Sequence, residues 1–255
     1  NHPLTARVIV NRIWHWHFGR GIVTTTDNFG HLGERPSHPF LLDHLARRFI
    51  ASNWSIKHLH REIMNSATYQ QSSLAAQSLK ESDPDNKMFA RWQARRVESE
   101  VLRDSILFKS NLLDLTMGGS MLTEQSNKYV DRKKQKQYIK SKRRTVYLPV
   151  LRSSGYDGQK AFDFPDAAVI TGKRNTSTVA PQALYLMNSE LVHKSSGTLA
   201  DILLRDTPDG GSSDRVSWLI LHLLGRGATD SERVRGEIFA RGYTRQTNIN
   251  CLQPR

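Results

Sequence analysis

Residues 11–33 read NRIWHWHFGRGIVTTTDNFGHLG, and no other stretch of the chain is as dense in large aromatic side chains, histidines and glycines. Trp14, Trp16 and Phe18 fall on the last turns of a predicted helix, and Gly19 offers the left-handed conformation in which helices commonly end. We expect this stretch to anchor the core, with both tryptophans buried. It contains no nucleophile beside a base, no phosphate-binding loop and no metal-ligand spacing that would identify a reaction.

Most of the remaining chain is predicted to be helical, because apolar residues recur with a period near 3.6. Ser37 is placed to cap a helix that begins at Pro39, since proline is favoured in the first helical turn, and Ser55 is placed to cap the next helix. The longest predicted helix carries an apolar stripe on one face, formed by Val101, Leu102, Ser105, Phe108 and Leu112. The predicted helices cover residues 4–18, 38–53, 55–67, 87–113, 179–191, 215–224 and 230–240.

One segment has the composition of a β-strand. Residues 145–150, TVYLPV, are rich in β-branched and aromatic side chains, and Pro149 would confine the strand to a sheet edge. The predicted fold class is therefore mainly α: an irregular multi-helix domain with long loops and at most a small β element near residues 145–151. We expect a single domain over residues 1–241, in which the Asp/Gly/Ser-rich stretch 206–214 is the one plausible linker.

The composition restricts the class of protein. The chain has 255 residues, of which 38% are hydrophobic and 24% charged, as in globular domains. No apolar run approaches the roughly 20 residues needed to span a bilayer. The single cysteine, Cys251, excludes an internal disulfide and any cysteine-based zinc or haem-attachment site, so we expect no cofactor in this chain. It begins at Asn1 rather than Met, which suggests a fragment of a longer protein.

The formal charge of +13 is concentrated in one segment. Residues 128–144 hold nine Lys/Arg and one acid, Asp131, so they carry +8, and the other 238 residues carry +5. Tyrosines lie within and beside this run, a mixture that suits polyanion binding through charge and stacking, or equally a solvated loop. Sulfated polysaccharide is as suitable a polymer as nucleic acid. The predicted polyanion-binding residues are Lys128, Arg132, Lys133, Lys134, Lys136, Lys140, Lys142, Arg143 and Arg144.

The histidines raise the question of a metal site, because eight of the ten precede residue 61. Two pairs are each two residues apart on predicted helices, about 200° around the axis, so neither pair can chelate one ion. Only the loop residues His31 and His38, with Asp27, could converge on an ion with His17. We predict no metal site. The two separated pairs are His15/His17 and His58/His60.

A second group of polar residues lies in a segment predicted to be irregular. Two aspartates flank Phe164-Pro165, and Lys173-Arg174-Asn175 follows. Carboxylates and an arginine in one loop can form a polar site, or an ion pair that fixes a long loop. No Gly-x-Ser-x-Gly elbow is present. The candidate catalytic residues are Asp163, Asp166, Arg174, His17 and His31.

Seven stretches, in order over about residues 1–240, carry a resemblance. They are NHPLTARVIVNRIWHWHFGRGIV, the loop and helix start at 33–44, NWSIKHLHREIMNSATYQQSS, RRVESEVLRDSIL, LDLTMGG, TVYLPVLR and AFDFPDAAVITGKRNTSTVAPQALYLMNS. Together they resemble the planctomycete-specific domain-one family. The chain departs from the family pattern at Phe40, where the family more often has Glu, and residues 242–255 read as an atypical tail.

The resemblance implies the C-terminal domain of a large exported, periplasmic protein. Upstream domains of such proteins commonly include a second uncharacterised domain and a c-type cytochrome domain, and no activity is established for the family. We therefore interpret the chain as an interaction or substrate-docking module for a redox partner domain. The alternative is an enzyme that acts on carbohydrate or another polyanionic polymer through a loop-built active site. A deep pocket joining the loops near residues 31 and 165 would favour the enzyme.

Overall fold

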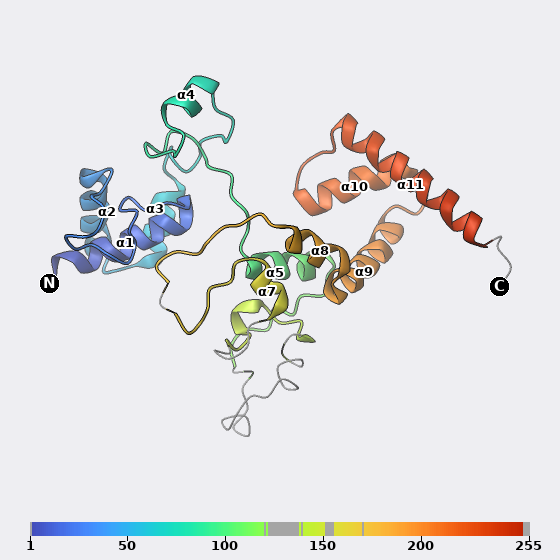
Figure 1. Ribbon diagram of the computed structural model, residues 1–255, viewed down its shortest axis with the longest axis horizontal. Helices are drawn as coiled ribbons and strands as arrows, with labels where there is room; N and C mark the ends of the chain where they lie inside the picture. Colours follow the sequence, from blue (N-terminus) through green and yellow to red (C-terminus); the bar gives the residue numbers. More distant parts are fainter. Residues whose placement is uncertain are drawn as a thin grey trace. The chain divides into compact units, whose positions relative to one another are not determined.

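The computed structural model describes residues 2–119, 121, 138, 140–150, 156–169 and 171–251, and this part of the chain is mainly α (Figure 1). The predicted fold class is confirmed. No β-strand occurs among the described residues, where a single isolated bridge joins Asp114 to Arg143. None of the helices found there is long and apolar enough to cross a membrane.

The elements follow one another along the chain as a series of helices of unequal length. They are α1 (Pro3–Phe18), α2 (Pro39–Ala51), α3 (Ile56–Met64), α4 (Gln77–Ser82), α5 (Ser99–Lys109), the 3-10 turn η2 (Thr145–Tyr147), α7 (Asp157–Ala161), α8 (Ala180–Asn188), α9 (Glu190–Asp206), α10 (Ser212–Leu224) and α11 (Asp230–Cys251).

The chain divides into two compact units. The first comprises Asn1–Val97 and the returning segment Ala168–Thr176, and the second comprises Glu98–Ala167 and Ser177–Arg255. The sequence placed its one plausible linker at residues 206–214, but the helices on both sides of that stretch, α9 and α10, belong to the second unit. The expectation of one continuous domain stays a prediction.

The core of the first unit is built by α1, α2 and α3, which pack together (Figure 1). On α1 the buried residues Ala6, Val10, Ile13 and Trp14 follow the spacing of one helix face. They meet apolar side chains of α2 and α3, of which Phe49 and Leu59 are fully buried. The prediction that residues 11–33 anchor the core is confirmed for this face of α1.

The turn after α1 is fixed by a buried asparagine. Gly19 ends the helix with φ 75°, as predicted. Asn11 is completely buried: its amide donates to the Val23 carbonyl at 2.9 Å, and its carbonyl oxygen accepts from the Val23 amide at 2.8 Å. These two bonds satisfy a polar group that would otherwise be costly to bury, and they hold the loop against α1.

The expectation that Trp16 is buried is wrong. Trp14 is 3% exposed, whereas Trp16 is 57% exposed. Residues two apart on a helix lie about 200° around its axis, so both tryptophans cannot face the same core. The aromatic density of the stretch is therefore divided between a buried face and an exposed one.

The long helix predicted over residues 87–113 is also wrong, because helical structure begins only at Ser99. The Asp83 carboxylate accepts from the backbone amides of Lys87 and Met88 at 2.7 and 2.8 Å, and Asn86 and Phe89 both adopt φ 51°. Such side-chain bonds to nearby backbone groups compete with a helix. Turns consequently occur over residues 84–91, and residues 92–98 have no regular structure.

Three smaller predictions also fail. The strand candidate at 145–150 begins instead with the 3-10 turn η2. Ser37 does not cap α2, because its hydroxyl donates to the Ile22 carbonyl at 3.2 Å. The helix predicted over residues 179–191 is two helices, α8 and α9, and Ser189 caps the second by accepting from the Val192 amide.

In the second unit α5 packs against α7, η2 and α9, and α10 lies beside α11 (Figure 1). The apolar face predicted for this region is divided: Val101 and Phe108 are 50% and 59% exposed, whereas Leu102 and Leu112 are partly buried. Gly158 of α7 lies so close to α8 that a Cβ at this position would meet the Tyr185 hydroxyl at 2.5 Å. A larger residue at this position would require the Tyr185 side chain to move.

Candidate functional site

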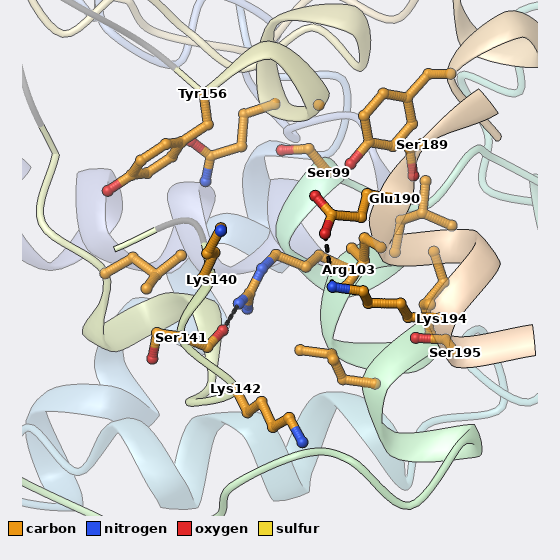
Figure 2. Close-up of a pocket in the computed structure, with 18 of the residues that line it drawn as sticks. Ser99, Arg103, Lys140, Ser141, Lys142, Tyr156, Ser189, Glu190, Lys194 and Ser195 are labelled. Atoms are coloured by element: carbon orange, nitrogen blue, oxygen red, sulfur yellow. Dashed lines mark hydrogen bonds and ion pairs between the residues drawn. The ribbon is translucent and has the colours of Figure 1, made fainter. Parts of the chain in front are cut away.

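The second unit contains a pocket of about 390 Å³ between α5, α7, α8, α9 and the segment at 140–148 (Figure 2). One face of α5 forms a wall of it, with residues spaced i, i+3, i+4, i+7 and i+8. Most of the lining surface is apolar, and Leu107, Phe162 and Leu191 contribute to it. The α5 residues that line the pocket are Ser99, Leu102, Arg103, Ile106 and Leu107.

Two rows of α9 side chains also line the pocket, at different positions around the helix. Glu190 and Lys194 are one turn apart and form an ion pair at 2.6 Å, with most of each side chain exposed. Leu191 and Ser195 form a second row about 100° around the axis. Ser195 is only 4% exposed. The charged row of α9 therefore lies at the rim of the pocket, and the row containing Ser195 lies further inside.

Arg103 fixes the wall formed by residues 141–145. Its side chain is 13% exposed, and the guanidinium donates to the carbonyl of Arg143 and the hydroxyl of Thr145, both at 3.0 Å, and to the carbonyl of Ser141 (Figure 2). Burial lowers the pKa of Arg103, but an arginine remains charged at any physiological pH. This side chain is thus a tie between α5 and the neighbouring segment.

Asp104 completes this tie. Its carboxylate accepts from the Thr145 backbone amide at 2.8 Å and from the Thr145 hydroxyl at 2.6 Å. Consecutive residues of α5 therefore hold the same threonine, which is itself buried. The pocket wall is anchored by charge-assisted hydrogen bonds, which are stronger than neutral ones.

Tyr156 lies between α7 and the segment at 140–148. Its hydroxyl donates to the Pro149 carbonyl at 2.9 Å. Burial raises the pKa of Tyr156 to about 12, with the nearby Arg103 charge acting in the opposite direction. The phenol is therefore protonated at physiological pH and serves as a hydrogen-bond donor rather than a base.

The charges that line the pocket favour an anion. Four cations, Arg103, Lys140, Lys142 and Lys194, line it together with one carboxylate, Glu190, so the described lining carries a net charge of +3. The hydrogen bond from Lys194, then its charge and that of Lys140, lower the pKa of Glu190. At the rim, the Glu190 carboxylate is thus surrounded by lysine ammonium groups, and the positive charges outnumber the negative one.

The predicted polyanion-binding run lies partly in this wall. Lys140 and Lys142 line the pocket, and Arg144 is exposed beside η2. Arg143 has structural contacts: it donates to the Thr116 carbonyl at 3.1 Å and lies 4.5 Å from the centre of the Tyr147 ring. Polyanion binding stays a prediction. Outside the described residues are Lys128, Arg132, Lys133, Lys134 and Lys136.

The candidate catalytic residues are distributed over both units, and none of them lines this pocket. Asp163 and Asp166 belong to the second unit, whereas His17, His31 and Arg174 belong to the first. The Asp163 carboxylate accepts from the Ser177 amide at 2.7 Å and the Ser177 hydroxyl at 2.8 Å, which fixes the loop. A catalytic role for the five residues stays a prediction.

The structure brings together two histidines that sequence reasoning treated separately. His17 Nε2 of α1 lies 2.7 Å from His60 Nδ1 of α3, and the two rings meet edge to face. Helical spacing in the sequence relates only histidines of the same helix. Because α1 and α3 pack against each other, the partner of His17 lies on the other helix. Among the described residues no group of three or more His, Cys, Asp or Glu could hold a metal ion.

This histidine pair predicts that acid destabilises the first unit. Burial, then the charges of His60 and Arg95, lower the pKa of His17 from its ordinary value of 6.5. Below pH 6.5 the unfolded chain therefore binds more protons than the folded one, so the free energy of unfolding falls with the pH. Urea denaturation at pH 7.5 and 5.5 should show this loss.

A His17→Gln variant, which keeps a hydrogen-bonding side chain but cannot titrate, should lose less stability over that interval. His44 is exposed on α2, so His44→Gln provides the control and should behave as the parent does. Equal acid sensitivity in the parent and in His17→Gln would contradict the assignment.

Comparison with known proteins gives a family but no activity. No curated protein and no solved structure matches the chain. One family does match, PSD1, described as a protein of unknown function (DUF1553), and the match covers residues 1–239. It ends within α11, close to the start of the predicted atypical tail at residue 242. Since the match covers most of its length, the chain belongs to the PSD1 family of proteins of unknown function.

Proposed function

We propose that the chain is a docking module, and that the pocket between α5 and α9 binds a small ligand with an apolar body and an anionic group. The observation that carries the proposal is the pocket itself: about 390 Å³, with a mostly apolar surface and, among its described lining residues, four cations against one carboxylate. Small-molecule sites are typically concave and largely apolar, with a few polar groups that orient the ligand.

The state of the polar side chains supports docking over catalysis. Arg103 is engaged with the chain's own carbonyl groups, and Ser189 caps α9. Tyr156 is protonated and bonded to a carbonyl, so it cannot act as a base at neutral pH. These groups build and charge the pocket rather than provide an activated nucleophile.

The finer biological setting is part of the proposal and is supported by the family resemblance. In it the module is exported, lies downstream of a c-type cytochrome domain in its parent protein, and presents a ligand to that redox partner. Lys140 and Lys142 belong both to the pocket and to the basic run that is predicted to bind polyanions. Two kinds of anion therefore suit the pocket, a free carboxylic acid and a sulfated sugar. Detection of the parent protein only in the cytoplasmic fraction of its source cells would overturn export.

Two opposite charge changes at the rim test the docking proposal. We expect 3-phenylpropanoate to bind the full chain saturably in calorimetry, and more weakly as salt is added. Lys140→Gln should weaken this binding about fivefold, because one exposed charge contributes roughly 1 kcal/mol. Glu190→Gln should strengthen it by a similar factor, because it removes a competing carboxylate. A sulfated disaccharide as a second probe distinguishes a sugar ligand from a free acid.

Both side chains are exposed, so neither change should affect folding. Lys57→Gln, an exposed lysine of α3 in the first unit, is the control for net charge. Absence of saturable binding by either probe, or equal weakening by Lys57→Gln, would refute the docking proposal.

A further inference from the structure

Among the described residues that line the pocket, one buried polar group lacks a partner, the hydroxyl of Ser195. The residue is 4% exposed, and its Oγ is buried without a hydrogen-bond partner. Serine within a helix commonly donates to the carbonyl four residues earlier, but here the hydroxyl makes no such bond. A buried hydroxyl that lacks a partner is destabilising, and in native structures such a group requires an explanation.

Three other polar side chains in the lining have partners within the chain. The Ser99 hydroxyl donates to Glu100 at 2.8 Å, Tyr156 donates to the Pro149 carbonyl, and Ser189 caps α9. Ser195, one turn from Leu191 on α9, differs from them because it lines the pocket while its hydroxyl is buried without a partner. Figure 2 shows it on the same helix as the rim residues Glu190 and Lys194.

The two rows of α9 therefore separate two kinds of recognition. The rim offers charge at Lys140 and Lys194, and the inner row offers an apolar wall with a single hydroxyl. A hydroxyl both donates and accepts, so it can pair with a ligand hydroxyl in either direction. A ligand that satisfies both ends has an anionic group at the rim and a hydroxyl at the far end of an apolar body.

We propose that the pocket recognises a hydroxyaryl carboxylate, with Ser195 as the binding residue for the ligand's hydroxyl. This inference rests on the docking function proposed above, and it names the chemical class of the ligand. The phenol ring lies against the apolar wall, the carboxylate lies among the rim cations, and the phenolic hydroxyl pairs with Ser195 Oγ. A site built to pair a hydroxyl discriminates against the analogue that lacks it.

Two probes that differ by one hydroxyl test the inference on the full chain by calorimetry. The parent should bind 3-(4-hydroxyphenyl)propanoate about tenfold more tightly than 3-phenylpropanoate, the difference expected for one buried hydrogen bond. In Ser195→Ala this preference should vanish, and 3-phenylpropanoate should bind at least as tightly as it does to the parent. Alanine is favoured in helices, so the variant should fold.

The neighbouring serine provides the control. Ser196 is exposed on the same helix, and Ser196→Ala should retain the tenfold preference. Equal binding of the two probes by the parent, or a preference that survives in Ser195→Ala, would overturn the role of Ser195 while leaving the docking proposal intact. Failure of both probes to bind would remove the docking proposal and this inference with it.

Discussion

Replacing Trp14 with alanine should lower the free energy of unfolding of the first unit by about 3–5 kcal/mol, the usual cost of removing a buried tryptophan. The indole is 3% exposed, and its ring lies 4.2 Å from that of Phe18 and 5.3 Å from that of Phe89. Neither ring can fill the space that the indole vacates without leaving its own contacts. Urea denaturation followed by circular dichroism measures the loss.

Two variants distinguish packing from general damage to α1. Trp16→Ala removes the same side chain from the exposed face and should change the stability by less than about 1 kcal/mol. Trp14→Phe should cost much less than Trp14→Ala, because the indole N–H is buried without a partner and its loss removes no hydrogen bond. If Trp16→Ala proved as destabilising as Trp14→Ala, the assignment of the core face would be wrong.

The sequence predicted elements whose signals are local. The first helix was placed within one residue of α1, its end at Gly19 was identified, and the Ser55 cap of α3 was found. The start of α11 shows a cap of the same local kind: Thr229 Oγ1 accepts from the Glu232 amide, and the Glu232 carboxylate accepts from the Thr229 amide. Each of these features depends on residues within four positions of one another.

The failures occurred where two local signals compete or where tertiary contacts decide. Residues 87–98 contain no strong helix breaker. The Asp83 carboxylate nevertheless accepts hydrogen bonds from two backbone amides, and these bonds compete with helix formation. On α5 the apolar pattern allowed two faces, and the structure buries the one containing Leu107 rather than the one containing Phe108. Periodicity alone could not choose between them, because both faces are partly apolar.

The candidate site was visible in the sequence only as charge. The basic run drew attention to Lys140 and Lys142, which do line the pocket. Most of the remaining lining comes from α5, α7, α8 and α9, which are far apart in the chain, and Ser195 is one of many serines. Its distinguishing property, burial without a partner, arises only when the helices assemble.

Arg103 makes three of the hydrogen bonds that hold the pocket wall. Replacing it with methionine keeps much of its length but removes the bonds to Ser141, Arg143 and Thr145. It also leaves the Asp104 carboxylate, which is 23% exposed, without the adjacent positive charge. We expect the second unit to lose about 3 kcal/mol of unfolding free energy, as when one member of a largely buried charged cluster is removed.

The local effect of Arg103→Met should exceed the global one. With its tie to α5 weakened, the segment at 141–148 should exchange its amide hydrogens faster than the rest of the second unit, and probe binding should be lost because this segment forms a pocket wall. Arg144→Met removes the same charge from an exposed neighbouring position and should change neither measurement appreciably. Unchanged amide exchange at 141–148 in Arg103→Met would show that Asp104 and Thr145 hold the wall without the arginine.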